Sequence, residues 1–483
     1  MHAFKLKAIG LSVALAFVAG GVSAAPSLQA AAKAVAGTQS IEFSGTGRWF
    51  QFGQAPAPNT PWPPFDVSSY VADLNFDTGA ARVQITRLQT PEPPRLRPAP
   101  VEQKVDQYVL GTTAWNVPVN PAAGAPATPS SQPAAVEERA AEILATPQGF
   151  LKAALANKAK TGKGGTEVSF TTGGKYRYVG TLNGKNEVVA VKTWVNTPVL
   201  GDTLIETKFS DYKDFGGVRF PAHIVRTEGG YPILDVQVSG VKLNPVVVIA
   251  VPDAVAKAAT PTVAVKADKV ADKVYYLTGG THHSVVIGQY DHVIVVEAPL
   301  NEERSLAVIA KAKELFPGKP IKYLVNTHAH FDHSGGLRTY VAEGATIVTP
   351  AANKDYYQKV WAAPRTISPD LLAKSKKPAK FETFTDSHVL TDGNRKVEIL
   401  SIAGSGHNDA FALVWLPEEK ILIEADAFTP TAANVPPPAQ ANPYAVNLYE
   451  NIQKHKLDAK QILGLHGPRV ATLEDLRTYI GQK

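Results

Sequence analysis

The sequence predicts an α+β protein in which an antiparallel, β-rich N-terminal domain precedes a C-terminal β-sandwich faced by helices. Three observations support this fold class. From about residue 39 to residue 248, strand-like runs alternate with glycine-containing turns. From residue 270 onward, apolar strands are mixed with amphipathic helical patterns. Between them, residues 244–269 are rich in Ala, Val and Pro, which is typical of a connection between domains.

The first 24 residues differ from the rest of the chain. Lys5 and Lys7 precede an apolar run over residues 8–21, and Val22-Ser23-Ala24 has the small-residue pattern of a cleavage site. The apolar run is too short to cross a bilayer, and no second one follows it. We therefore predict a signal peptide cleaved near Ala24, and a periplasmic or secreted mature protein without a transmembrane segment.

Composition limits the classes of protein that the chain can belong to. Its 483 residues suggest two or three domains. The formal charge of +6 is spread along the chain without a long basic run, so we expect no nucleic-acid partner. The chain has no cysteine, which excludes disulfides and thiolate metal ligands. We expect a signal peptide over residues 1–24, a β-rich domain over 25–250, a linker over 251–269 and a second domain over 270–483.

The β-rich domain is predicted from runs of β-branched and aromatic residues bounded by turns. Dipeptides such as Asn183-Gly184 and Gly229-Gly230 are typical of hairpins. Residues 90–134 are rich in Pro and Ala and predict a long, partly extended loop with one short strand near Tyr108. Residues 135–159 predict a helix interrupted near Pro147. The predicted strands cover residues 41–50, 81–86, 176–182, 187–194, 204–209, 223–226 and 234–241.

The second domain is predicted from alternating strand and helix patterns. The predicted strands cover residues 274–277, 284–287, 292–297, 321–326, 346–349, 396–402, 411–416, 421–425 and 461–465. The predicted helices cover residues 301–315, 352–361, 443–456 and 473–480, and another begins near residue 337.

Residues 328–333, His-Ala-His-Phe-Asp-His, form the densest group of metal-binding side chains in the sequence. An apolar strand precedes this group and a glycine turn into a helix follows it. The group therefore lies at the C-terminal end of a strand, where ligands gather in α/β proteins. Imidazole nitrogen and carboxylate oxygen are ligands that zinc accepts. Because the chain has only 12 histidines, this clustering indicates a metal site rather than an ordinary polar loop.

Three further residues of the same chemical type follow three later strands. His407 comes after the strand that ends at Ile402, Asp426 directly after residues 421–425, and His466 directly after residues 461–465. Since all three follow strand ends, we expect them to converge with the first group.

The pattern His328-x-His330-x-Asp332-His333, followed by His407, Asp426 and His466, resembles that of the metallo-β-lactamase-fold hydrolase superfamily over roughly residues 268–483. The resemblance implies an αββα sandwich and two zinc ions per chain. It assigns His328, His330 and His407 to the first zinc. It assigns Asp332, His333 and His466 to the second zinc, with Asp426 bridging the two.

This pattern also implies a mechanism. Two divalent ions about 3.5–4 Å apart can share a hydroxide, because metal binding lowers the pKa of water toward about 7. By resemblance, Asp332 is the catalytic residue that orients this nucleophile and passes on its proton. His282 and His283 lie in the turn between the first two predicted strands of the domain, and we give them a tentative substrate-binding role. Further candidates for the cleft wall are Tyr356, Tyr444 and Asn434, and Asn408 is a candidate donor beside His407.

We therefore expect an exported dinuclear zinc hydrolase that cleaves an ester, lactone, thioester or related small-molecule bond. A bridging Asp426 favours the thioesterase, lactonase and phosphodiesterase branches over the lactamases. The alternatives are a β-lactam hydrolase, an iron-dependent oxidoreductase similar to persulfide dioxygenases, and a non-catalytic periplasmic binding protein. Residues 212–221 and the hairpins after them have a limited resemblance to the curved sheet of periplasmic lipoprotein-carrier proteins.

Overall fold

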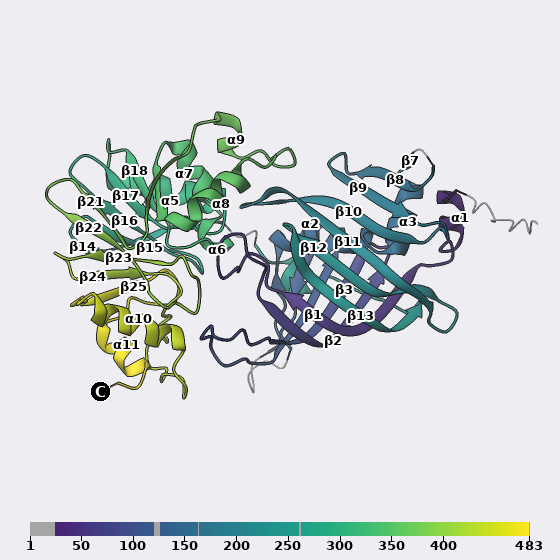
Figure 1. The fold of residues 1–483 in the computed structure, drawn as a ribbon, viewed down its shortest axis with the longest axis horizontal. Helices are drawn as coiled ribbons and strands as arrows, with labels where there is room; N and C mark the ends of the chain where they lie inside the picture. The colour runs from purple at the N-terminus through teal and green to yellow at the C-terminus, as the bar shows by residue number, and fades with distance from the viewer. Residues whose placement is uncertain (1–24, 120–125, 163, 260–261, 483) are drawn as a thin grey trace, which may run out of the picture.

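The structure is a computed structural model that describes residues 25–119, 126–162, 164–259 and 262–482. The predicted signal peptide lies outside the described residues. Within these ranges, no helix has both the length and the apolar character that crossing a bilayer requires. The chain forms an N-terminal sheet and a C-terminal sandwich that lie side by side (Figure 1).

The N-terminal part is a single antiparallel sheet of 13 strands within the described ranges, with the order β6-β5-β4-β3-β2-β1-β13-β12-β11-β10-β9-β8-β7. The strands are β1 Ser40–Phe50, β2 Pro64–Asn75, β3 Ala80–Gln89, β4 Gln103–Leu110, β5 Thr113–Asn116, β6 Ser130–Ser131, β7 Lys160–Thr161, β8 Glu167–Thr172, β9 Tyr176–Leu182, β10 Val188–Thr197, β11 Gly201–Asp214, β12 Arg219–Glu228 and β13 Tyr231–Leu243. Buried and exposed residues alternate along strands such as β11, so one face of the sheet is covered and the other is solvated.

Helices cover one face of this sheet. They are α1 Leu28–Lys33, α2 Val136–Leu144 and α3 Pro147–Ala156, with a 3₁₀ turn at Pro133–Ala135. Thr146 caps α3 by accepting a hydrogen bond from the Gly149 amide, and Pro147 occupies the first turn, where it needs no amide hydrogen. The predicted interruption near Pro147 is therefore a boundary between two helices. Phe150 packs so closely on Gly180 that a Cβ there would meet its ring at 2.2 Å.

Two features of this part differ from the prediction. Strand β2 was not predicted, because Pro61, Pro63 and Pro64 crowd its beginning and proline is typical of loops. The predicted short strand near Tyr108 corresponds to β4, but the predicted loop over the rest of residues 90–134 also contains the strands β5 and β6. These short strands extend the edge of the sheet beyond β3.

The C-terminal part is the predicted αββα sandwich. A seven-stranded sheet has the order β14-β15-β16-β17-β18-β19-β20, and a five-stranded sheet has the order β21-β22-β23-β24-β25. The strands of the first sheet are β14 Lys266–Ala271, β15 Val274–Thr278, β16 Ser284–Gly288, β17 Val293–Val296, β18 Ile321–Val325, β19 Thr346–Pro350 and β20 Lys380–Phe384. Those of the second are β21 Ser387–Thr391, β22 Lys396–Ser401, β23 Ala412–Leu416, β24 Ile421–Glu424 and β25 Gln461–Gly464.

Helices lie on the outer faces of the sandwich. They are α5 Glu302–Leu315, α6 Phe331–Ser334, α7 Leu337–Glu343, α8 Ala351–Trp361, α9 Leu371–Ser375, α10 Pro443–Lys454 and α11 Leu473–Tyr479. One apolar core fills the space between the sheets, where β16, β17, β23 and β24 are buried along their length, and a second core lies under α5, α7 and α8. Strand β13 ends at Leu243 and the first sheet begins at Lys266, so the connection covers residues 244–265 and both begins and ends earlier than the predicted linker 251–269. A short helix, α4 Asp253–Ala256, lies within that connection.

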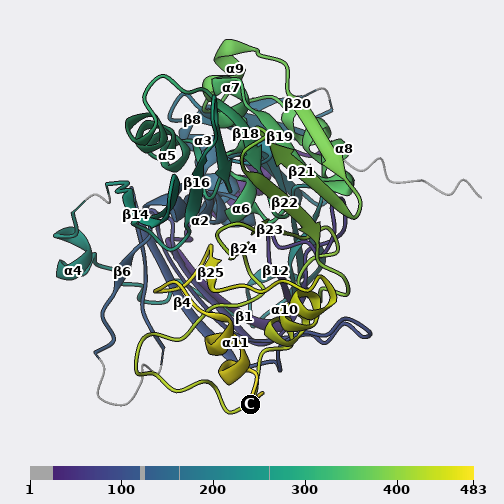
Figure 2. The ribbon, with the colours of Figure 1, turned by 90° about the vertical axis from the view of Figure 1, so that its left-hand side faces the viewer.

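The two parts are docked against each other, with the N-terminal sheet behind the sandwich in the view of Figure 2. One contact joins the turn between β10 and β11 to residues 362–370. The buried guanidinium of Arg365 donates to the carbonyls of Pro198 (2.9 Å) and Val199 (2.7 Å). The Asp202 carboxylate in turn accepts the amide of Thr366 at 2.8 Å. Backbone carbonyls and a carboxylate of the N-terminal part are thus hydrogen-bonded by donors of the sandwich.

We expect Arg365→Met to weaken this docking. The substitution keeps most of the side-chain volume but leaves buried carbonyls without a charged donor, which costs about 2–3 kcal/mol. Urea denaturation followed by tryptophan fluorescence measures the loss. Arg48→Met is the control, because the Arg48 side chain is 60% exposed and its change should be near zero. Equal midpoints for the two variants would contradict the importance of this contact.

Candidate metal centre

The histidine-rich segment is held at the end of β18 by the way the chain turns there. His330 precedes the short helix α6, and Gly335 and Gly336 then lead into α7. A Cβ on Gly335 would lie 1.9 Å from the Leu300 carbonyl oxygen, and one on Gly336 would lie 1.9 Å from Ser305 Oγ. Only glycine fits such a close approach, so these residues fix the path of the chain just after the histidines.

The structure brings together all seven residues that the sequence singled out. They form two groups, and within each group the ligand-type atoms lie within 4.8 Å of one another. The first group is His328, His330, His407 and Asp426, and the second is Asp332, His333 and His466 together with His282, which is not one of the seven. The segments that carry them come from the ends of strands in both sheets, as the sequence predicted. The metal-binding roles of these residues remain predictions that the geometry supports.

Asp426 lies between the two groups and points one oxygen toward each. Its Oδ2 is 2.9 Å from His407 Nε2 and 3.6 Å from His328 Nε2. Its Oδ1 is 2.9 Å from His333 Nε2 and 3.0 Å from His466 Nε2. A carboxylate in this position can bridge two cations.

Hydrogen bonds on the outer side of the imidazole rings determine which nitrogen faces the centre. His328 Nδ1 donates to Thr327 Oγ1 at 2.9 Å, and His466 Nδ1 donates to the Thr281 carbonyl at 3.2 Å. His333 Nδ1 donates to Glu297 Oε2 at 3.3 Å. Each ring therefore presents its Nε2 lone pair to the interior, which is how acceptors around a metal site orient histidine ligands.

His330 has the opposite arrangement, because its Nε2 carries the outer bond. That nitrogen donates to a backbone carbonyl at 3.0 Å, and the buried Nδ1 has no hydrogen-bond partner. In two places, the ring nitrogens of two histidines face each other directly. The His333 and His466 Nε2 atoms are 3.0 Å apart, and the His328 and His407 Nε2 atoms are 3.3 Å apart. Imidazole nitrogens converging on shared points, with a carboxylate between them, fit a pair of zinc-type cations.

Electrostatics at the centre also favour cations. Burial lowers the pKa of His328 to about 4 and the pKa of His330 well below its ordinary value, so both rings are neutral ligands. Burial alone would raise the pKa of Asp426, but the facing His333 and His407 lower it more strongly, and the carboxylate stays ionised. For Asp332, burial is likewise outweighed by the hydrogen bond from His282 and the electrostatic effect of the neighbouring His333, and its pKa falls below the ordinary value.

Glu297 is a functional candidate that the sequence analysis missed. The residue follows β17, is fully buried, and has the left-handed φ of 73°. Its carboxylate accepts from Thr327 Oγ1, from Asn326 Nδ2 at 2.9 Å and from His333 Nδ1. Glu297 thus supports two of the histidines, one directly and one through Thr327. A glutamate that ends a fully apolar strand was the signal available in the sequence.

The tentative substrate residues His282 and His283 occupy different environments. His282 Nε2 lies 3.1 Å from Asp332 Oδ2, and its ring packs on His466 with centroids 4.2 Å apart. His283 is buried, and its Nε2 donates to the Gly467 carbonyl at 2.9 Å. This position favours support of the loop around His466 over contact with a substrate.

The further candidates for the cleft wall also occupy different environments, and not all of them lie near the metal centre. The Tyr444 ring packs on His407 with centroids 5.3 Å apart, and Asn408 donates to a carbonyl of the N-terminal part at 3.1 Å. Tyr356 lines a cavity between the two parts of the chain. Asn434 lies in a separate hollow beside α11 and is not brought to the centre.

The chain is similar to several known proteins. A family profile described as "Metallo-beta-lactamase superfamily" matches residues 277–450. A curated relative, the metallo-beta-lactamase type 2 of Elizabethkingia meningoseptica, is 26% identical over 167 residues. The match covers 33% of this chain and 60% of the relative, so the chain spans less than two thirds of that protein's length.

Solved structures similar to the chain include a metallo-beta-lactamase from Pontibacter korlensis. It is 19% identical, with a TM-score of 0.34, and the match covers 45% of this chain and 98% of that one. Another is the metallo-beta-lactamase FIM-1 from Pseudomonas aeruginosa in its mono-zinc form. It is 20% identical, with a TM-score of 0.35, and the match covers 46% of this chain and 96% of that one.

We expect Glu297→Gln to weaken metal binding. The amide removes the negative charge behind His333 and Thr327, and losing such an outer partner typically costs about 10–100-fold in metal affinity. Titration with zinc against a competing chelator measures the change. Glu382→Gln is the matched control. Glu382 of β20 accepts a hydrogen bond from His388 Nε2 of β21 at 3.0 Å, and neither residue belongs to the two groups of ligands. Equal zinc affinity in both variants would contradict a supporting role for Glu297.

Proposed function

We propose that the chain is a zinc-dependent hydrolase with two metal ions, because a profile of the metallo-β-lactamase superfamily matches residues 277–450. The observation that carries the proposal is the placement of Asp426, whose two oxygens each approach a different group of histidines. A centre for one ion would not need a carboxylate shared in this way. The proposed cofactor is zinc, because imidazole and carboxylate ligands without cysteine suit it.

Bound zinc would supply a water activated as a nucleophile and electrophilic assistance to the substrate oxygen. The side chains of the protein would hold the ions in place and take up the proton of the water. His328, His330 and His407 would hold the first ion, and Asp332, His333 and His466 would hold the second. The ionised Asp332 offers acceptor oxygens at the second group, where it can orient a water and take up its proton.

The proposed substrates are small molecules with an ester, lactone, thioester or related bond. A bridging Asp426 and a ligand set without cysteine support this choice. β-Lactam hydrolysis is a second candidate, because the curated relative is named a metallo-beta-lactamase. A single-iron oxidoreductase and a non-catalytic binding protein have less support, since both groups of ligands are complete. Export to the periplasm or medium is proposed from residues 1–24 of the sequence alone.

A hydrolysis screen across lactones, thioesters, phosphodiesters, sulfate esters and a chromogenic β-lactam tests the proposal. We expect turnover of at least one class, and we expect Asp332→Asn to reduce kcat by about 10²–10⁴-fold, because the variant loses the base that takes the proton. Asp291→Asn is the control, since Asp291 pairs with His292 in an exposed position outside the centre. Turnover that survives Asp332→Asn unchanged would rule out the proposed mechanism.

Removal of the metal should destabilise the protein as well as inactivate it. An ion that binds the folded chain at about 1,000 times its dissociation constant contributes about 4 kcal/mol to stability. Treatment with a chelator should therefore lower the melting temperature, and zinc should restore both stability and turnover. Scanning calorimetry with and without zinc measures the effect. An unchanged melting temperature together with full activity after chelation would argue against a metal-dependent enzyme.

A further inference from the structure

The loop between β1 and β2 of the N-terminal sheet, residues 51–63, lies directly on the histidine-rich segment. Three consecutive residues of this loop contact three consecutive residues of the segment. The Gly53 carbonyl accepts the Phe331 amide at 3.0 Å. Gln54 Nε2 donates to Asp332 Oδ1 at 2.8 Å, and the Ala55 carbonyl accepts from His330 Nε2 at 3.0 Å.

The bond from His330 to Ala55 fixes the protonation state of a predicted metal ligand. Because Nε2 carries the hydrogen, the lone pair must be on Nδ1, the buried atom that faces the first group without a hydrogen-bond partner. The outer acceptors of His328, His333 and His466 come from the sandwich itself, from Thr327, Glu297 and Thr281. His330 obtains its acceptor from the N-terminal part.

The hydrogen bond from Gln54 to Asp332 gives the two oxygens of that carboxylate different partners. Oδ1 is occupied by the Gln54 amide, while Oδ2 lies 3.1 Å from His282 Nε2 and 3.7 Å from His333 Nε2. Gln54 therefore holds the carboxylate with one oxygen turned toward the second group. A carboxylate that is free to rotate would lose this preference.

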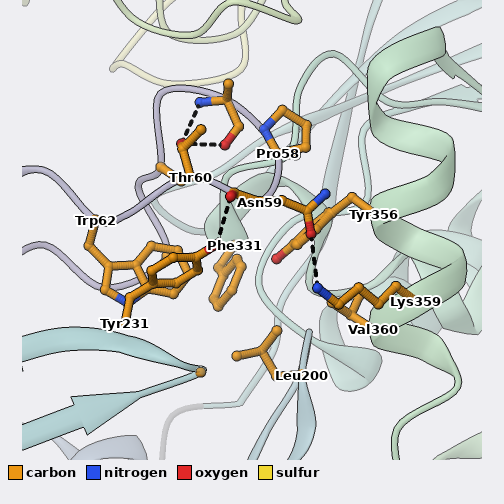
Figure 3. A pocket seen from close by; sticks show the side chains of 15 residues that line it. Pro58, Asn59, Thr60, Trp62, Leu200, Tyr231, Phe331, Tyr356, Lys359 and Val360 are labelled. Atoms are coloured by element: carbon orange, nitrogen blue, oxygen red, sulfur yellow. Dashed lines mark hydrogen bonds between the residues drawn. The ribbon is translucent and has the colours of Figure 1, made fainter.

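Aromatic packing fixes the loop in this position. Phe331, between the ligands His330 and Asp332, packs edge-on against Phe52 and Trp62 with ring centroids 5.2 and 5.5 Å away. Gly53 has the left-handed φ of 79°, and a Cβ there would meet the Phe331 ring at 2.8 Å. Figure 3 shows Phe331 beside Trp62 and Tyr231 at a cavity of about 90 Å³ that residues of both parts line.

Polar contacts extend the docking to both sides of the loop. Asn59 accepts from Tyr231 through its carbonyl at 2.6 Å and from Lys359 of α8 through Oδ1 at 3.3 Å (Figure 3). On the side of His407, the Pro56 carbonyl accepts the Asp409 amide at 2.8 Å, and Arg95 forms a salt bridge with Asp409 at 2.8 Å. The segments around His330 and His407 are thus both held by the N-terminal part.

We propose that the N-terminal domain is a structural part of the metal centre, in which Gln54 is a positioning residue that holds Asp332 for the second ion. The Ala55 carbonyl orients His330 for the first ion in the same way. This inference rests on the proposed two-zinc centre. It gives the N-terminal sheet a function in metal binding, beyond packing against the sandwich.

The test compares Gln54→Met and Gln54→Ala with the matched control Gln51→Ala in the full-length chain. Met retains the length of the side chain but cannot donate to Asp332. Gln51 belongs to the same loop but lines a hollow of the N-terminal sheet together with Arg139 and Glu142. Zinc stoichiometry and affinity are measured by chelator competition, and the visible spectrum of the cobalt-substituted protein reports the geometry at each ion.

We expect the Gln54 variants to bind the second ion about 10–100-fold more weakly than wild type and the first ion with unchanged affinity. The Gln51→Ala protein should match wild type at both. Circular dichroism and melting without metal verify that the Gln54 variants fold, and Gln54→Met remains informative if Gln54→Ala does not fold. Wild-type affinity and cobalt spectra in the Gln54 variants would overturn the inference. A wild-type protein that binds no metal would instead overturn the proposed function.

Discussion

The buried carboxylate of Asp426 is the constraint on which the centre depends. Strands β18, β24 and β25 end around it, and each must have the correct register for its following residue to reach the same point. Four histidines face this one carboxylate, which would be unfavourable in the interior unless their lone pairs are shared with a cation. The sandwich core therefore has a chemical role as well as a stabilising one. Each group of ligands takes residues from loops of both sheets, so the packing of the two sheets brings the members of each group together.

The sequence was most informative where a residue's chemistry and its position at a strand end coincide. The segment 328–333 and the residues His407, Asp426 and His466 could be predicted because apolar strands precede them. Glu297 ends an apolar strand as well, but a single glutamate without a neighbouring histidine is a much weaker signal of metal chemistry than the segment 328–333. Gln54 could not be found, because its partner Asp332 is 278 positions away in the chain and only the docking of two sheets brings them together.

The elements that were predicted incorrectly share a physical cause. Prolines at positions 61, 63 and 64 suggest a loop, although proline at the first residue of a strand is compatible with a sheet. Residues 113–116 lie in a Pro/Ala-rich stretch, but they form a strand because β4 offers a free row of backbone groups. In both regions, pairing with a neighbouring strand outweighs local composition. The antiparallel N-terminal sheet and the αββα sandwich were nevertheless predicted correctly from hairpin turns and helical periodicity.

The turn at Gly53 has a consequence for how this architecture can change over generations. In most hairpins, the connection between two strands tolerates insertions and substitutions freely. Here the turn's backbone and its Phe331 contact leave room only for glycine, and its neighbours touch side chains that belong to another domain's chemistry. Substitutions in this hairpin loop are therefore limited by the adjoining group of histidines and carboxylates, and the two domains should diversify together rather than as interchangeable modules.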